Sequence, residues 1–203
     1  MKLYYASGAC SLAVHIALRE VGATFEPVAV DLGRHVVIAD GADYFAVSPR
    51  GYVPLLEFDD GSRHTEVAAL LQHVADMDAS QALIGAYGSA RRLAVVEGLA
   101  FVASELHRGF SPWLWHKETA ESTRRSAKAK LAERFAELDA LLARQDFLAG
   151  DYSVADAYAF TILNWTSFLG MSLTACPQLT AYLERVSARP AVQAALRAEG
   201  LLR

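Results

Sequence analysis

Along the first part of the chain, the spacing of apolar residues changes repeatedly between the alternation of a strand and the wider period of a helix. A hairpin signal, Asp59-Asp60-Gly61, separates the last two strand-like segments. The strand-like segments are residues 2–5, 26–32, 53–58 and 63–65, and helical spacing covers residues 11–21, 43–47 and 67–76. The predicted order is therefore strand, helix, strand, helix, hairpin, helix, with four strands.

Beyond residue 88 the chain is rich in helix formers and has almost no strand signal. A capping box, Ser153-Val154-Ala155-Asp156 with Asp in place of Glu, opens an apolar run, so a structural role is expected for Asp156. Residues 78–88 have no sustained period and are predicted to link a first domain, 1–77, to a helical domain, 89–203. The helical stretches are residues 89–116 (with a bend near Gly109 or Pro112), 121–144, 153–169, 178–188 and 191–198.

The composition is that of a globular protein and excludes several classes. Of 203 residues, 53% are hydrophobic and 21% are charged, and 19 Lys and Arg against 23 Asp and Glu give a net charge of −4. This charge argues against nucleic-acid binding, which normally needs a basic surface. No run approaches the ~18 apolar residues of a membrane span, and residues 1–5 are too few for the h-region of a signal peptide before Cys10. Two distant cysteines, Cys10 and Cys176, then indicate a reducing compartment, and a cytoplasmic location is expected.

Three segments of the first domain combine groups that recognise a small peptide. Val53-Pro54 is an extended pair whose backbone groups can bond to another extended chain. Further on, Glu66 offers a carboxylate to an ammonium group, and the N–H of Val67 lies at a helix start that favours a carboxylate. Cys10, just before an apolar helical run, adds sulfur chemistry. Together these residues predict a pocket for a small zwitterionic thiol peptide.

Several motifs recur in an order and spacing that are specific only when they are taken together. They are Gly8-Ala9-Cys10-Ser11-Leu12, His15-Ile16-Ala17-Leu18-Arg19-Glu20, Ser48-Pro49-Arg50-Gly51-Tyr52-Val53-Pro54, Asp59-Asp60-Gly61, Thr65-Glu66, Ser104-Glu105-Leu106-His107-Arg108-Gly109-Phe110, Ser153-Val154-Ala155-Asp156-Ala157-Tyr158 and Arg189-Pro190-Ala191-Val192-Gln193. With these motifs the chain resembles the glutathione transferase family, and specifically its bacterial beta class, over essentially its whole length.

The resemblance implies an α/β thioredoxin-like N-terminal domain with a mixed four-stranded sheet and an all-α C-terminal domain, which together make the glutathione transferase fold. It also implies a homodimer that uses glutathione as co-substrate, without a metal, and conjugates its thiolate to small apolar electrophiles. Detoxification is the role expected from the family, with a catabolic step or redox defence as alternatives.

At the sulfur, the resemblance implies roles for Cys10, Ser11 and His107. The helix dipole is expected to lower the pKa of the Cys10 thiol, which in the family faces the glutathione sulfur and can form a mixed disulfide; the alternative is an inert buried cysteine. Ser11 either donates to a thiolate or caps the helix. His107 is expected to ionise near neutral pH and to bond to the thiol or the leaving group, unless it is part of a solvated helix face. Tyr5 is taken as a strand residue.

The resemblance also implies a set of glutathione-binding residues. A cis Pro54 would turn the N–H and C=O of Val53 outward to pair with the cysteinyl part of the peptide. Glu66 and Val67 would take the γ-glutamyl end, although the family commonly has Ser or Gly in place of Val67. The full expected set is Tyr52, Val53, Pro54, Glu66, Val67 and Arg108, with Tyr52 replacing the usual Gln and Arg108 near the glycyl carboxylate.

The second domain holds the candidates for the electrophile pocket. Phe110, Trp113 and Trp115 are expected to line it, with a place in the helical core as the alternative, and Trp165 is assigned to the core. Ala100 and Asn164 stand where the family often has Asn and Arg. No cluster has metal-ligand spacing, and there is no Walker-type glycine loop.

Three functions are compatible with these residues. The first is a glutathione S-transferase. The second is thiol–disulfide exchange or glutathione-dependent peroxide reduction through Cys10. The third is a non-enzymatic ligand-binding protein of the same fold, in which the departures at Tyr52, Val67, Ala100 and Asn164 have eroded the site.

Overall fold

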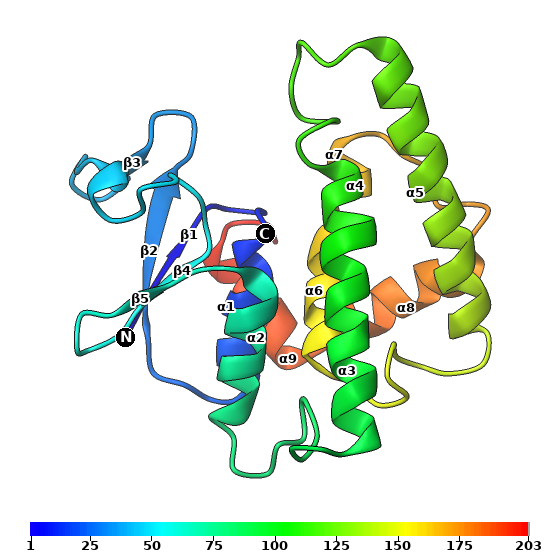
Figure 1. Cartoon of the computed structure of the whole chain (residues 1–203), viewed down its shortest axis with the longest axis horizontal. Coiled ribbons are helices and arrows are strands. Elements are labelled where there is room, and N and C mark those ends of the chain that lie inside the picture. Colours follow the sequence, from blue (N-terminus) through cyan, green and yellow to red (C-terminus); the bar gives the residue numbers. More distant parts are fainter. Residues whose placement is uncertain (203) are drawn as a thin grey trace. The chain divides into compact units, whose positions relative to one another are not determined.

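The computed structural model of the protein describes residues 1–202. Their contacts divide into two compact units, one made of Met1–Gln81 with the C-terminal segment from Arg189 onward, and the other of Ala82–Ala188. Figure 1 labels the strands and the α-helices of both units. The break after Gln81 falls inside the predicted linker 78–88. The helical domain was predicted to run from residue 89 to 203. This end point is wrong, because the segment from Arg189 onward packs with the first unit.

The first unit contains one mixed sheet with the strand order β3-β2-β1-β4-β5. Strand β1 pairs in parallel with β2, and the pairs β1–β4, β2–β3 and β4–β5 are antiparallel. The strands are β1 (Lys2–Tyr5), β2 (Glu26–Asp31), β3 (Val36–Val37), β4 (Leu55–Glu57) and β5 (Arg63–His64). The four predicted strands are all present. The predicted total of four is corrected to five, because the two-residue strand β3 is too short to leave an alternating pattern.

Helix α1 (Ser11–Glu20) is the centre of this unit and contacts β1, α2 (Val67–Asp76) and α9 (Pro190–Ala198). Its residues Ser11–Leu18 are all buried, because α1 is covered on several sides rather than along one stripe. The guanidinium of Arg189, just before α9, also binds Glu20 with two N–O distances of 2.7 and 2.9 Å. These contacts explain why the C-terminal segment belongs to the first unit. A short 3₁₀ helix, η1 (Tyr44–Ala46), precedes β4.

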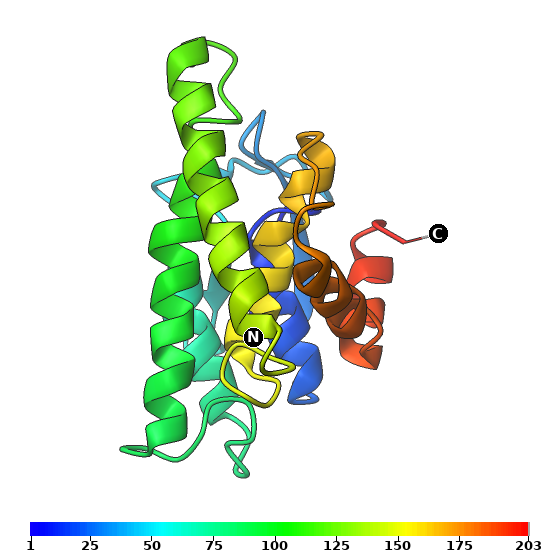
Figure 2. The same cartoon turned by 90° about the vertical axis from the view of Figure 1, so that its right-hand side faces the viewer.

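The named elements of the second unit are all helices, as predicted. Helix α6 contacts α3 and the π-helical segment η2, while α5 contacts α4 and α8. Figure 2 shows α5, the long yellow-green helix of this unit, from the side. The elements are α3 (Ala90–Phe101), η2 (Val102–His107), α4 (Arg108–Phe110), α5 (Glu121–Leu142), α6 (Val154–Leu163), α7 (Trp165–Phe168) and α8 (Pro177–Ser187).

The predicted helix 89–116 ends earlier than expected, at Phe110. Ser111 is extended, with φ −113° and ψ 132°, as residues before proline generally are. The six residues of η2 have the wider π-helical turn, a form that is rare in proteins and frequent at functional sites.

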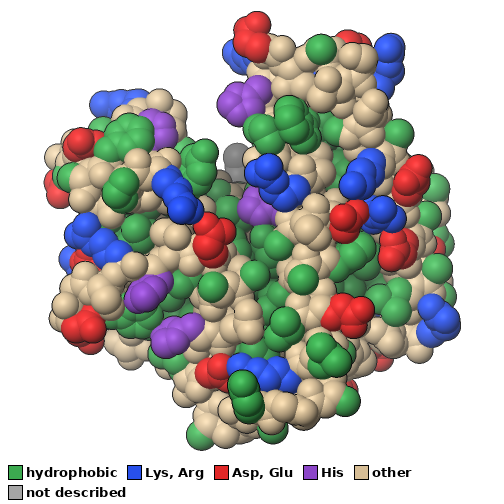
Figure 3. Space-filling model, in the orientation of Figure 1, with side chains coloured by type: hydrophobic (Ala, Val, Ile, Leu, Met, Phe, Trp, Pro, Cys, Tyr) green, Lys and Arg blue, Asp and Glu red, His purple; other side chains and the backbone are tan. Residues whose placement is uncertain are grey.

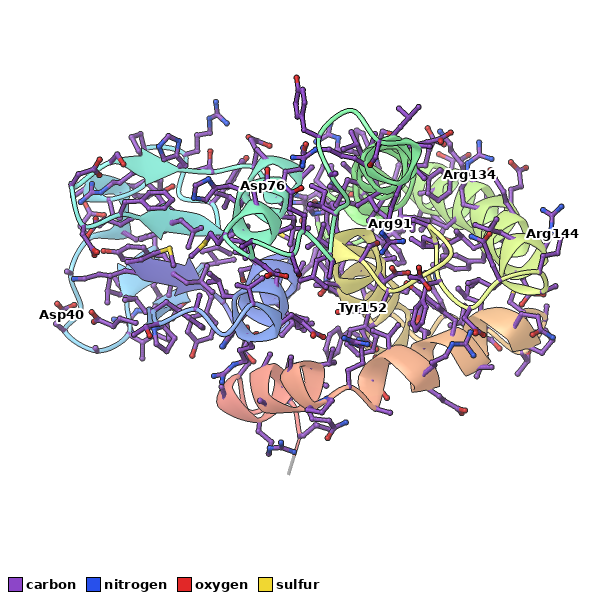
Figure 4. The ribbon with its side chains drawn as sticks, turned by 90° about the horizontal axis from the view of Figure 1, so that it is seen from below. Asp40, Asp76, Arg91, Arg134, Arg144 and Tyr152 are labelled. Carbon is purple, nitrogen blue, oxygen red and sulfur yellow. The ribbon has the colours of Figure 1, made fainter. Side chains whose placement is uncertain are left out.

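Polar contacts fix the loop that leads into α6. The guanidinium of Arg91, on α3, donates to the carbonyl oxygens of Ala82 and Tyr152, each at 3.1 Å, and Figure 4 shows the labelled Arg91 and Tyr152 close together. Ser153 and Asp156 form the predicted capping box. Asp156 is fully buried, and its carboxylate oxygens accept hydrogen bonds from four donors: Leu148 N–H, Ser153 N–H, the Ser153 hydroxyl and the Tyr182 hydroxyl.

The surface fits the slightly acidic composition. On the face drawn in Figure 3, acidic and basic side chains are interspersed, without a broad field of one sign. Within residues 1–202, no helix has both the length and the apolar character that a membrane crossing requires.

Replacing Asp156 with Ala should lower the free energy of unfolding by about 2–4 kcal/mol, because it leaves several buried donors without an acceptor. Asp151→Ala is the matched control, since the Asp151 carboxylate is 92% exposed, and it should change stability by less than about 0.5 kcal/mol. Denaturant unfolding of both variants measures the difference. Equal stabilities would show that the buried carboxylate is dispensable.

Candidate active site

The loop between β1 and α1, which carries Cys10, is held by a buried carboxylate from the C-terminal segment. Oε2 of Glu199 accepts the Gly8 N–H at 3.0 Å, and the Ser7 hydroxyl donates to the Glu199 carbonyl at 2.6 Å. The other carboxylate oxygen lies 2.9 Å from Nδ1 of His15, and both of these side chains are fully buried. Glu199 was not predicted as a site residue, because in the sequence it only follows the last apolar helix.

Ser11, at the start of α1, closes the same loop. Its hydroxyl donates to the Ala6 carbonyl at 3.3 Å and accepts the Ala6 N–H at 3.2 Å. The side chain is fully buried. Ser11 therefore binds the backbone five residues earlier, a third role beside the predicted thiolate contact and helix cap.

The Cys10 thiol lies at the N-terminus of α1, as predicted, and donates a hydrogen bond to the carbonyl oxygen of Val53 at 3.2 Å. Burial raises the pKa of this thiol to about 12, although the N–H groups of Cys10 and Ser11 act in the opposite direction. The prediction of a lowered pKa is therefore wrong. At neutral pH Cys10 keeps its proton and acts as a hydrogen-bond donor.

The Val53–Pro54 peptide bond is cis, as the resemblance implied. The preceding carbonyl, that of Tyr52, accepts hydrogen bonds from the Tyr44 hydroxyl at 2.9 Å and the Ser48 hydroxyl at 3.2 Å. The ring of Tyr52 is 69% exposed. The backbone before Pro54 is thus anchored from inside the unit, while the side chain of Tyr52 faces solvent.

Gly51 lets this turn pass close to its neighbours. Its φ is +66°, and a Cβ there would come within 2.7 Å of the His35 ring and 2.8 Å of the Phe45 ring. Those two rings stack with centroids 4.4 Å apart. Only glycine fits both the conformation and the space.

Glu66 stands immediately before α2 with a left-handed φ of +70°. Such a conformation in a residue other than glycine is uncommon and clusters at functional sites. Its carboxylate forms an ion pair with Arg50 at 3.0 Å, and Arg50 was not among the predicted residues. The N–H groups of Ala69 and Leu70 both bond to the Glu66 carbonyl at 3.0 Å. Val67 is the first residue of the helix, and its side chain is buried. Its backbone N–H is one of those at a helix start that have no acceptor within the helix.

In the second unit, His107 has a partner within that unit. Its Nδ1 lies 2.7 Å from the Tyr158 hydroxyl, and its ring packs edge-on against Trp165 with centroids 5.1 Å apart. Burial, and secondarily the charge of Arg108, lower the pKa of His107 to about 4. The expectation that His107 ionises near neutral pH is therefore wrong, and the imidazole is neutral there.

The three predicted electrophile-pocket aromatics lie in different surroundings. Phe110 is fully buried, and Trp115 packs edge-on against Trp165 with centroids 5.4 Å apart. Trp113, 46% exposed, lines a hollow of about 340 Å³ together with Arg108. Within the described residues, this hollow brings together one predicted aromatic and one predicted binding residue, and Phe110 belongs to the core.

The groups of the first unit define the chemistry that is available there. A thiol donor, an anchored backbone beside a cis proline, a carboxylate and a helix N-terminus all come from Met1–Gln81. Among residues 1–202, no cluster of His, Cys, Asp and Glu side chains is arranged to hold a metal ion. The arrangement can bind an extended zwitterion through its backbone and its two ends, and it can donate a hydrogen bond to a sulfur.

In a Cys176→Ala variant, the rate of Cys10 alkylation should rise about tenfold per pH unit from about pH 7 to about pH 10, without a plateau. The reason is the raised pKa, which keeps the thiolate a minor and growing fraction throughout this range. Iodoacetamide labelling followed by mass spectrometry measures the rate, and the double variant with Cys10→Ala gives the background. A plateau below pH 8 would show that the thiol ionises near neutrality.

Comparison with known proteins identifies the family. Residues 8–77 match the model of the glutathione S-transferase N-terminal domain, and residues 101–190 match that of the C-terminal domain. Glutathione S-transferase GstA of Escherichia coli O157:H7 is 40% identical over 202 residues, which cover 99% of this chain and 100% of that relative.

Solved structures agree. A sphingomonad glutathione S-transferase complexed with glutathione has a TM-score of 0.93 and 42% identity, and a bacterial beta class glutathione S-transferase of Sphingomonas chungbukensis has a TM-score of 0.94 and 40% identity. Both comparisons cover 100% of each chain. The thioredoxin-like sheet and the helical second unit are thus those of the glutathione transferase fold. The chain belongs to the glutathione S-transferase family and is a transferase that acts on glutathione.

Proposed function

We propose that glutathione lies along the first unit, with its cysteinyl part against Val53 and its γ-glutamyl end at Glu66 and Val67. The observation that carries this proposal is the clustering of these groups around one anchored turn: the Cys10 thiol contacts the Val53 carbonyl at 3.2 Å, and Val53 precedes the cis Pro54. The ammonium group binds the Glu66 carboxylate, and the N–H groups at the start of α2 favour a carboxylate.

In the proposed reaction the glutathione thiol gives its proton to solvent water, and the resulting thiolate attacks the electrophile. A sulfur–carbon bond forms and the bond to the leaving group breaks, or the electron pair of the attacked double bond moves away from the sulfur. Cys10 keeps its proton at neutral pH, and when glutathione is bound its S–H turns from the Val53 carbonyl and donates a hydrogen bond that stabilises the thiolate. Alignment of the two reactants supplies a further part of the rate.

The raised pKa of Cys10 favours conjugation over thiol–disulfide exchange, because exchange requires an attacking thiolate. The apolar character of the electrophile, the homodimer, the cytoplasmic location and a detoxifying role belong to the same proposal. The family resemblance implies the electrophile, the homodimer and the detoxifying role, and the two distant cysteines, Cys10 and Cys176, indicate the cytoplasmic location.

Glu66→Ala should weaken glutathione binding by roughly 10–100-fold, because it removes a charge-assisted hydrogen bond to the ammonium group. Calorimetric titration with glutathione at millimolar concentration measures the change. Asp40→Ala is the control, since Asp40 is an exposed carboxylate of the same unit and should leave the affinity within about twofold. Absence of saturable binding to the unaltered protein would rule out the proposed site.

Cys10→Ala separates the two reactions. Conjugation of glutathione to a chromogenic electrophile should fall by about tenfold, the worth of one hydrogen bond to a charged group, and should not disappear. Complete loss of turnover, together with a glutathione mixed disulfide trapped at Cys10 in the unaltered protein, would instead favour the redox reaction. Mass spectrometry of the intact protein detects that adduct.

A further inference from the structure

Arg50 lies beside the carboxylate that is proposed to hold the γ-glutamyl end of the peptide. Its Nη1 is 3.0 Å from Oε1 of Glu66. The turn that carries it is fixed, because the Gly51 N–H donates to the Ser48 carbonyl at 2.7 Å and no side chain larger than hydrogen fits at Gly51. The backbone of Arg50 is therefore in place before any ligand arrives.

Stability does not explain this ion pair. The side chains of Arg50 and Glu66 are 69% and 73% exposed, and exposed pairs of this kind contribute little to the folded state. An exposed pair also opens at little cost, so both charges are available to a ligand. By contrast, the Glu199 carboxylate that holds the Cys10 loop is fully buried.

The α-carbon of a γ-glutamyl group carries an ammonium and a carboxylate next to each other. If Arg50 took no part in binding this end, the ammonium group would displace its guanidinium from Glu66 and leave Arg50 without its anion. If the zwitterion enters between the two side chains, the ammonium faces Glu66 and the α-carboxylate faces Arg50. Each protein charge then keeps an opposite charge, and the guanidinium can bind the carboxylate in a bidentate manner.

Resting on the proposed function, we infer that Arg50 is a specificity-determining residue that binds the α-carboxylate of the γ-glutamyl group. The ion pair with Glu66 is the resting form of this subsite, and the ligand exchanges one ion pair for two. The site thereby selects peptides that carry both charges on the α-carbon of the γ-glutamyl group. A peptide that lacks the α-carboxylate gains nothing from Arg50.

The test compares two ligands by calorimetric titration of the full chain. One is glutathione, and the other is 4-aminobutanoyl-cysteinylglycine, which keeps the ammonium group and lacks the α-carboxylate. Arg50→Ala should weaken glutathione binding roughly tenfold, as for a charge-assisted hydrogen bond, and should change binding of the truncated peptide by less than about twofold. Arg50→Lys should recover part of the loss, because it restores the charge without the planar fork.

Lys2→Ala is the matched control, since it also removes one positive charge from an exposed ion pair of the first unit, that with Glu26. It should leave both affinities unchanged. Three results would overturn the inference: tighter glutathione binding by Arg50→Ala, which would make Arg50 a competitor of the ligand; equal weakening for both peptides; or no weakening for either. If the unaltered protein fails to bind glutathione, the proposed function itself fails, so the two failures are distinguishable.

Discussion

The position of Cys10 depends on the buried carboxylate of Glu199. The side chain of Glu199 forms hydrogen bonds with the Gly8 N–H and with His15, and the backbone carbonyl of the same residue accepts a hydrogen bond from the Ser7 hydroxyl. Removing one partner of a buried hydrogen bond typically costs about 1–3 kcal/mol, whereas replacing both partners with apolar groups of the same shape can be nearly neutral. The network is therefore better understood as a device that fixes one conformation of the loop than as a source of net stability.

Two opposing effects act on the Cys10 sulfur, and their sizes decide its chemistry. A helix N-terminus typically stabilises an anion by about 0.3–1 kcal/mol, which is less than one pKa unit. Burial raises the thiol pKa from an ordinary value of 9.0 to about 12, an effect of about 4 kcal/mol. The effect of burial is the larger, so Cys10 remains a thiol that donates a hydrogen bond to the Val53 carbonyl.

Local patterns were sufficient to predict most of the elements and the capping box. The strand 2–5, the helix 67–76 and the pair Ser153–Asp156 all follow from spacing within a few residues, and the structure has them. The cis Pro54 followed from the family resemblance alone, since most X–Pro bonds in folded proteins are trans. The strand, the helix and the capping box needed no knowledge of the distant parts of the chain.

Contacts between distant residues could not be predicted in this way. Glu199 meets Gly8 across 191 residues, and Arg50 meets Glu66 across 16. No periodicity records such pairs, because their side chains meet only after the chain has folded. The prediction that His107 ionises near neutral pH failed for the same reason. Its pKa is lowered mainly by burial beside Tyr158 and Trp165, which the residue type does not reveal.

The polar residues of the first unit fall into a buried group and an exposed group, and the two groups have different roles. Ser11, His15 and Glu199 are fully or almost fully buried and bond to the protein itself, so they hold the backbone. Arg50 and Glu66 are largely exposed, so their charges remain accessible to solutes. A buried charge could not exchange partners with a ligand without a large desolvation penalty, whereas an exposed pair on a fixed backbone can. A site that must recognise a zwitterion reversibly therefore needs rigid, buried supports beneath weakly paired surface charges, and this unit has both.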